Sequence, residues 1–156
     1  LLPVDITGKN IRLGISLSDL YKKLATYPVK GAYVFLDACF SGGYKSAAPL
    51  LAQKGVRVVP KVGLPQGNTL SFSSSSGDQT SSVYHEKKQG YYTYFLIKTI
   101  RDAKGNISMK ELFDRTSAAV KRATALIDKI QEPQCMASPT WIGWEDIKLE
   151  TPVVTP

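Results

Sequence analysis

The residue best suited to do chemistry is Cys39, in the segment Val34-Phe-Leu-Asp-Ala-Cys-Phe-Ser-Gly-Gly43. An apolar run leads into this cysteine, and a turn at Ser41-Gly42-Gly43 follows it. A strand that ends at the thiol would hold it rigidly, while the glycines would let other backbone approach it closely. A nucleophile needs such a fixed position and an open face. The alternative is a structural thiol, because free cysteine is among the residue types most often buried.

The chain has a single histidine, His85, and none precedes Cys39. A cysteine nucleophile is usually activated by a histidine base. His85 follows the cysteine in the polar run Tyr84-His-Glu-Lys-Lys88, so we expect it at the surface and not beside the thiol. The sequence therefore predicts part of an active site, whose base is supplied from outside this chain.

The composition is that of one ordinary globular domain. Hydrophobic residues make up 43% of the 156 residues and charged residues 21%, and no apolar run approaches the roughly 20 residues that span a bilayer. The two cysteines, Cys39 and Cys135, are too few for a disulfide framework, which favours a reducing compartment, and we expect a cytoplasmic protein. The clustered cysteines and histidines of a zinc site are missing from the sequence, so we expect no metal and no other cofactor.

The net charge of +7 raises the question of nucleic-acid binding. Basic residues occur as scattered pairs, such as Lys22-Lys23 and Lys121-Arg122, without a zinc-finger spacing or an RNA-binding aromatic signature. We therefore expect a solvated basic surface with no nucleic-acid or membrane partner. Salt-dependent binding to DNA or RNA would support the alternative of a basic nucleic-acid binder.

Helices and strands alternate along the chain, which predicts an α/β layered domain over residues 1–149 and a Pro-rich tail over 150–156. The run 32–38 is apolar up to Asp37, as in a central parallel strand covered on both faces. Ser108-Met-Lys-Glu111 fits a capping box that opens a helix to about residue 130. The other expected helices are 16–24, 46–54 and 91–103, the other strands are 56–59, 69–75 and a short one within 141–149, and the expected loops include 77–89 and 131–140.

The segment Leu36-Asp-Ala-Cys-Phe-Ser-Gly-Gly43 resembles the nucleophile segment of caspase-like cysteine peptidases, especially metacaspases and their bacterial relatives. Further segments are similar to parts of the same family, in the same order, so that the resemblance covers roughly residues 1–148. They are Leu1–Asp5 after the family's His-Gly motif, Ile15–Leu20 in the helix before the nucleophile strand, Phe72–Ser81 at the substrate cleft, and Gly90–Ile97 in the helix that follows.

The resemblance implies a caspase–hemoglobinase fold, a three-layer sandwich with a mostly parallel central sheet whose N-terminal strands are missing from this chain. It implies a peptidase in which Cys39 is the nucleophile and its N–H is one donor of the oxyanion hole. The family's His-Gly motif, which carries the base and the second donor, would fall before Leu1. We therefore expect two partners, a peptide or protein substrate and a histidine-bearing segment of the same precursor. The alternative is a catalytically silent caspase-like scaffold or interaction module.

Specificity would come from acidic residues near Cys39. Asp37 lies on the cysteine's face of the strand and is either a capping acid or, as the resemblance implies, a carboxylate on the pocket floor that prefers Arg or Lys. Asp78 is either an Asx-turn residue or a second acid of that pocket. Ser75 and Ser76 could offer backbone at the cleft edge to an extended peptide.

We predict that this chain by itself has little or no peptidase activity. A free thiol has a pKa of about 8.5 and is only a few per cent thiolate at neutral pH, and without the histidine nothing protonates the leaving amine. Adding the histidine-bearing segment should restore hydrolysis of Arg and Lys peptides, measured with fluorogenic substrates. Full activity of the isolated chain would refute this prediction.

Overall fold

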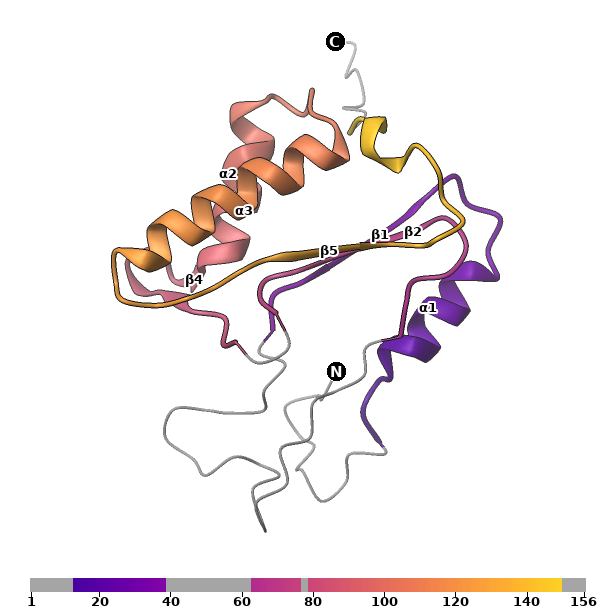
Figure 1. The fold of residues 1–156 in the computed structure, drawn as a ribbon, viewed down its shortest axis with the longest axis horizontal. Coiled ribbons are helices and arrows are strands. Elements are labelled where there is room, and N and C mark those ends of the chain that lie inside the picture. Colours follow the sequence, from indigo (N-terminus) through magenta and orange to yellow (C-terminus); the bar gives the residue numbers. More distant parts are fainter. Residues whose placement is uncertain (1–12, 39–62, 77–78, 150–156) are drawn as a thin grey trace.

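The computed structural model describes residues 13–38, 63–76 and 79–149 of the chain (Figure 1). These residues form a mixed α/β structure around a small sheet. The helices are α1 (Leu17–Ala25), α2 (Tyr91–Asp102) and α3 (Met109–Ala125), with 3-10 turns at His85–Lys87 and Trp144–Asp146. The strands are β1 (Ala32–Leu36), β2 (Thr69–Ser73), β3 (Val83–Tyr84), β4 (Gln89–Gly90) and β5 (Gln134–Ala137).

Strand β2 lies in the middle of the main sheet, whose order over the described residues is β1-β2-β5. β1 runs parallel to β2 and places Phe35 opposite Phe72, while β5 runs antiparallel and places Cys135 opposite Phe72. The strand that leads to Cys39 is therefore paired in parallel with its neighbour β2. β3 and β4 form a separate antiparallel hairpin.

Both faces of β2 are covered, and all five of its residues are buried. Figure 1 shows α1 on one side of the sheet and α2 with α3 on the other. Leu70 and Phe72 join the apolar core, whereas Ser71 on the opposite face accepts a hydrogen bond of 2.7 Å from Tyr21 Oη of α1. The alternation of side chains along the strand thus separates an apolar face from a hydroxyl-bearing face.

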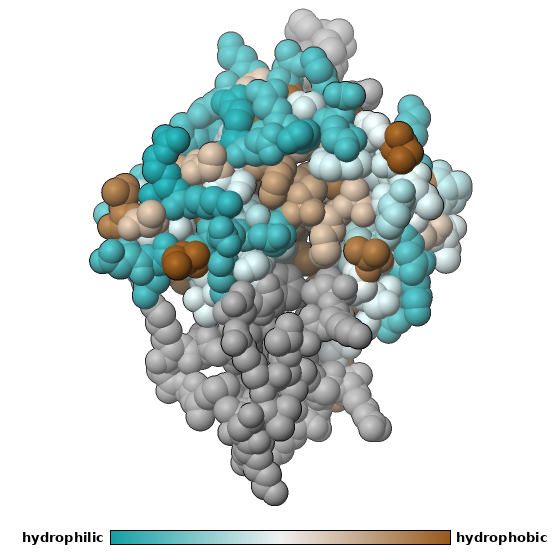
Figure 2. Space-filling model, in the orientation of Figure 1, coloured by the Kyte–Doolittle hydropathy of each residue, from teal (hydrophilic) through white to brown (hydrophobic). Residues whose placement is uncertain are grey.

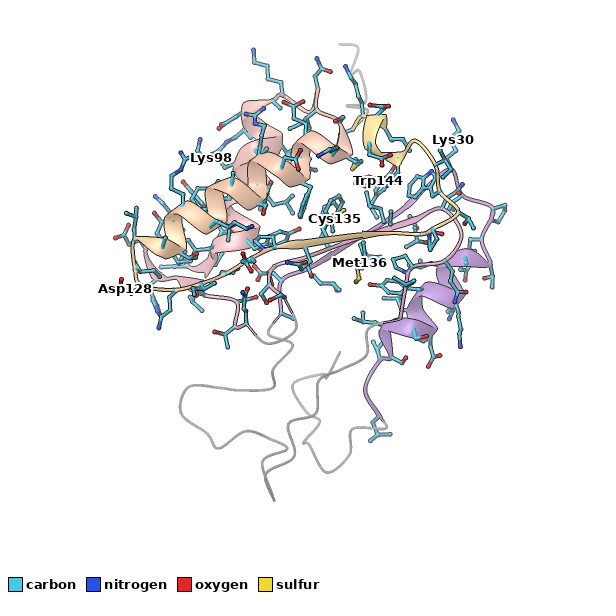
Figure 3. The ribbon with its side chains drawn as sticks, in the orientation of Figure 1. Lys30, Lys98, Asp128, Cys135, Met136 and Trp144 are labelled. Atoms are coloured by element: carbon cyan, nitrogen blue, oxygen red, sulfur yellow. The ribbon has the colours of Figure 1, made fainter. Side chains whose placement is uncertain are left out.

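The hydrophobic core lies between the sheet and helices α2 and α3. Figure 3 shows Cys135 of β5 pointing to this side of the sheet and Met136 pointing to the side of α1. The outer surface of α2 and α3 is mostly hydrophilic (Figure 2), as expected for helices that bury one stripe of side chains. The buried members of the core are Leu70, Phe72, Tyr92, Ile107, Met109, Leu112, Val120 and Trp141.

Serine side chains begin two of the helices, as the sequence predicts. Ser16 Oγ accepts a hydrogen bond of 3.2 Å from the Asp19 N–H, and Ser108 Oγ accepts one of 3.2 Å from the Glu111 N–H. Each hydroxyl satisfies a backbone donor that the first turn of a helix leaves without a partner. Across the described ranges, no helix is both long enough and apolar enough to cross a membrane.

Helix α3 ends at Ala125 and not near residue 130, so that part of the prediction is wrong. Asp128 adopts a left-handed conformation with φ of 54°, and the Lys129 N–H donates to the Thr124 carbonyl at 2.9 Å, which closes the end of the helix. Ile130 is 77% exposed, so continuing the helix would bury little apolar surface.

Tertiary pairing creates strands where the sequence predicts loops. The expected loop 131–140 contains β5, which pairs with β2 although Pro133 and Pro139 flank it. The expected loop 77–89 contains β3 and the first residue of β4. The strand expected within 141–149 is instead a 3-10 turn followed by one bridge between Ser108 and Lys148. The helix expected at 46–54, the strand at 56–59 and the tail at 150–156 lie outside the described residues.

We predict that Leu112→Ala lowers the free energy of unfolding by about 2–5 kcal/mol, because it leaves a cavity between α3 and the sheet. Leu112 is 0% exposed, whereas Leu126, just past the end of the same helix, is 84% exposed. Leu126→Ala is therefore the matched control, with an expected change within about 0.5 kcal/mol. Urea unfolding followed by circular dichroism measures both, and equal losses would contradict this account of the core.

Candidate active site

The structure describes the strand that leads to Cys39 but not Cys39 itself. β1 ends at Leu36, and Asp37 and Ala38 are the last described residues before the cysteine. Asp78, the expected second acid, also lies outside the described residues. The geometry of the site is therefore that of Asp37, Ala38 and the groups that contact them.

The segment after β2 holds the segment after β1. The Ser74 N–H donates a 2.8 Å hydrogen bond to the Leu36 carbonyl, which continues the parallel pairing one residue past β2. Ser74 Oγ and Ser81 Oγ both lie near the Ala38 carbonyl oxygen, at 3.4 Å and 3.3 Å, and the two hydroxyls also contact each other. The carbonyl that directly precedes Cys39 is thus held by two serine hydroxyls.

Ser75 and Ser76, expected at the cleft edge, lie in the same segment. Ser75 is 1% exposed, its hydroxyl donates to the Gln79 carbonyl at 3.4 Å, and its own carbonyl accepts from Ser73 Oγ at 3.3 Å. Ser76 is half-buried, and its carbonyl accepts from the Gln79 N–H at 3.0 Å. These bonds give partners to the carbonyls of Ser75, Ser76 and Gln79, which lie on either side of residues 77–78 in the sequence.

Two glutamines that the sequence analysis did not single out hold the backbone of these segments through hydrogen bonds from their side chains. Gln131 is 1% exposed; its Oε1 accepts from the Ser82 N–H at 2.8 Å and its Nε2 donates to the Ser74 carbonyl at 2.9 Å. The Gln79 side chain pairs with Glu132, accepting from its N–H at 2.8 Å and donating to its Oε2 at 3.2 Å. Buried amides that satisfy backbone groups in this way make a segment rigid.

Asp37 caps helix α2 from another part of the chain. Its Oδ2 accepts hydrogen bonds from the Thr93 N–H at 3.2 Å and from Thr93 Oγ1 at 2.6 Å. The N-cap residue of α2 is Gly90, which has no side chain to satisfy the first turn. A Cβ at Gly90 would lie 2.2 Å from Asp37 Oδ2, so glycine is what lets the carboxylate approach. An anion at this end of a helix is also favoured by the helix dipole.

The side chain of Asp37 is exposed. The capping alternative is present in the structure. The helix that Asp37 caps is α2, and its residue Thr93 lies 56 residues after Asp37 in the sequence. Capping uses Oδ2, and the same carboxylate can still meet a cation through its other oxygen.

His85 is exposed, in the 3-10 turn between β3 and β4. The expected surface position of His85 is therefore confirmed. Within the described part of the chain, no group of three or more His, Cys, Asp or Glu side chains could hold a metal ion.

Cys135, the second cysteine, sits on β5 against the core and is a free thiol. Burial, with smaller contributions from the Asp114 and Glu145 carboxylates, raises the pKa of the Cys135 thiol to about 12. A thiol with such a pKa is almost wholly protonated at neutral pH and is a poor nucleophile. Of the two cysteines, Cys39 therefore remains the candidate for chemistry.

A family model described as the caspase domain of peptidase family C14 matches residues 1–140 of the chain. The matched range includes β1, β2, α2, α3 and β5, together with Ser74, Ser81 and Thr93, which contact Ala38 or Asp37. No curated protein matches the chain.

We predict that Cys135 is alkylated by iodoacetamide at pH 8 about a thousandfold more slowly than an unperturbed thiol, because its thiolate fraction is that much smaller. Mass spectrometry of the labelled peptide measures the rate, and the protein unfolded in urea is the control. Since the folded pKa lies above the unfolded value of 9.0, this residue stabilises the fold below about pH 9 and loses that contribution as the pH rises toward 12. Equal labelling rates with and without urea would contradict this.

Proposed function

Because this chain belongs to the caspase-domain family of peptidases, we propose that it is the cysteine-bearing part of an endopeptidase that hydrolyses peptide bonds after Arg or Lys. Family membership is carried by the match over residues 1–140, which makes a cysteine peptidase the coarse conclusion. The basic specificity rests on Asp37, an exposed carboxylate that is held by Thr93 and lies two residues before Cys39 in the sequence.

The proposed reaction begins with the Cys39 thiolate, which attacks the carbonyl carbon of the peptide bond after a basic residue. The C–N bond breaks, the amine leaves with a proton from a histidine outside this chain, and a thioester remains on Cys39. Water, deprotonated by the same histidine, adds to the thioester carbonyl. The C–S bond then breaks, the acyl part of the substrate leaves as a carboxylic acid, and Cys39 is again a thiolate. The negative charge on the carbonyl oxygen would be stabilised by backbone donors, one of them the Cys39 N–H.

Asp37 suits recognition of a guanidinium or ammonium group because its carboxylate is fixed before the substrate arrives. Two hydrogen bonds from Thr93 hold Oδ2, and neither of them uses Oδ1. The positive end of α2 offsets part of the Asp37 charge, so a second acid would strengthen the pocket. We propose Asp78 for this role, with Ser75 and Ser76 bordering the cleft.

The finer features of the fold belong to the same proposal. We propose the three-layer sandwich of the caspase–hemoglobinase fold, completed by a histidine-bearing segment that supplies the remaining strands. The layering supports this, since α1 covers one side of the β1-β2-β5 sheet and α2 with α3 cover the other (Figure 1).

We predict that Asp37→Asn lowers kcat/KM for Arg and Lys peptides by about a hundredfold, because it removes the charge that pairs with the substrate cation. The asparagine carbonyl can still accept from Thr93, so the cap on α2 is kept and the melting temperature should change little. The assay uses the protein together with its histidine-bearing segment and a set of fluorogenic peptides that differ at the residue before the cleaved bond.

The matched control is Asp102→Asn, which removes a carboxylate from the other end of α2, where it pairs with Lys98 at 2.6 Å. It should leave kcat/KM unchanged, and Cys39→Ala should abolish hydrolysis. Cleavage of Arg peptides by Asp37→Asn at the wild-type rate would remove Asp37 from the proposal. A wild-type protein without hydrolysis of any peptide would favour the silent scaffold.

A further inference from the structure

The two carboxylate oxygens of Asp37 have different surroundings. Oδ2 accepts two hydrogen bonds, from the Thr93 N–H at 3.2 Å and from Thr93 Oγ1 at 2.6 Å. Among residues 13–38, 63–76 and 79–149, no donor bonds to Oδ1 and no Lys or Arg side chain forms an ion pair with Asp37. Because the side chain is exposed, Oδ1 is the oxygen that a ligand can reach.

Thr93 uses the full acceptor capacity of Oδ2. An ionised carboxylate has about four acceptor positions, two on each oxygen. The backbone N–H and the hydroxyl of Thr93 take both positions on Oδ2. Gly90 lies against the same oxygen, so that a Cβ at this position would collide with it. A substrate cation therefore meets Asp37 through Oδ1.

Both partners in this arrangement are held by their neighbours in the chain. The Leu36 carbonyl, directly before Asp37, accepts a 2.8 Å hydrogen bond from the Ser74 N–H. Thr93 follows Tyr92, which is 2% exposed and belongs to the hydrophobic core. Neither side chain can turn away without disturbing β1 or α2, so the fold itself determines which oxygen is occupied.

The number of accessible oxygens matters because Arg and Lys use a carboxylate differently. A guanidinium binds best with two parallel N–H groups, one to each oxygen, whereas an ammonium is a point charge that one oxygen can serve. We propose that Thr93 is a specificity-determining residue, which fills Oδ2 and so makes the site accept Lys about as well as Arg. This inference rests on the proposed function, in which Asp37 binds the basic side chain of the substrate.

The test compares Thr93→Ala with Thr93→Ser in the protein assembled with its histidine-bearing segment. Both variants lose the methyl group and keep the backbone N–H, so they differ only in the hydroxyl. We expect wild type and Thr93→Ser to have kcat/KM values for matched Arg and Lys peptides within about threefold of each other. Thr93→Ala should raise the ratio of Arg to Lys about tenfold, because a second guanidinium N–H can then reach Oδ2.

The matched control is Thr99→Ala, the same substitution six residues further along α2, which should leave the ratio of Arg to Lys unchanged. Binding of the same peptides to Cys39→Ala, with and without Thr93→Ala, gives the ratio of dissociation constants without hydrolysis. Fluorescence anisotropy measures it, and it should change in the same direction as the ratio of kcat/KM values.

Equal ratios of Arg to Lys in the alanine and serine variants would overturn the inference and leave the proposed function standing. A wild type that prefers Arg by about a hundredfold would also overturn it, since such a preference requires both oxygens. This second result needs no variant and is obtained even if Thr93→Ala prevents folding. A wild type that hydrolyses neither peptide would overturn the proposed function, and the inference with it.

Discussion

The complete burial of β2 is the constraint on which the rest of the structure depends. A strand covered on both faces must satisfy every polar group without water, so its backbone pairs with β1 and β5 and its hydroxyls find partners within the protein. Ser71 bonds to Tyr21 of α1, while Leu70 and Phe72 pack against the core. A slip of one residue would exchange the two faces of β2, so the register of β2 is tightly specified. Because all five residues of β1 pair with β2, the same constraint positions Asp37 and Ala38, the described residues that precede Cys39.

Elements with strong local signals could be predicted from the sequence. α1 and α2 follow from apolar residues at helical spacing, and Ser16 and Ser108 begin helices because a capping hydroxyl acts within one turn. β5 could not be predicted in this way, since Gln134–Ala137 does not alternate between apolar and polar residues and lies between prolines. Its conformation comes from pairing with β2, which is more than sixty residues away in the sequence. Local propensity does not contain that information.

The candidate site likewise has some features that can be predicted from the sequence and others that only the tertiary structure creates. The segment around Cys39 is recognisable because its motif is contiguous, and the exposed position of His85 follows from its polar neighbours. The contacts of Ala38 with Ser74 and Ser81 span 36 and 43 residues, and those of Asp37 with Thr93 span 56. The sequence suggested a cleft-edge role for Ser75 and Ser76, but it did not single out Ser74 and Ser81, whose hydroxyls only the fold places beside the end of β1. The roles of these serines are therefore properties of the tertiary structure.

The double use that we propose for Asp37 would link stability to specificity. Its carboxylate caps α2 in place of a side chain that Gly90 lacks, and a substrate cation would meet the same group. A side chain at this position that could not accept a hydrogen bond from Thr93 would therefore also perturb the start of a helix whose other side packs in the core through Tyr92. Selection for a different substrate could not freely replace Asp37; it would favour residues that still accept from Thr93. Asparagine and glutamine satisfy that condition in principle, because each has a side-chain carbonyl that can accept a hydrogen bond. The helix cap would thus narrow the range of substrate specificities that this site can acquire by single substitutions.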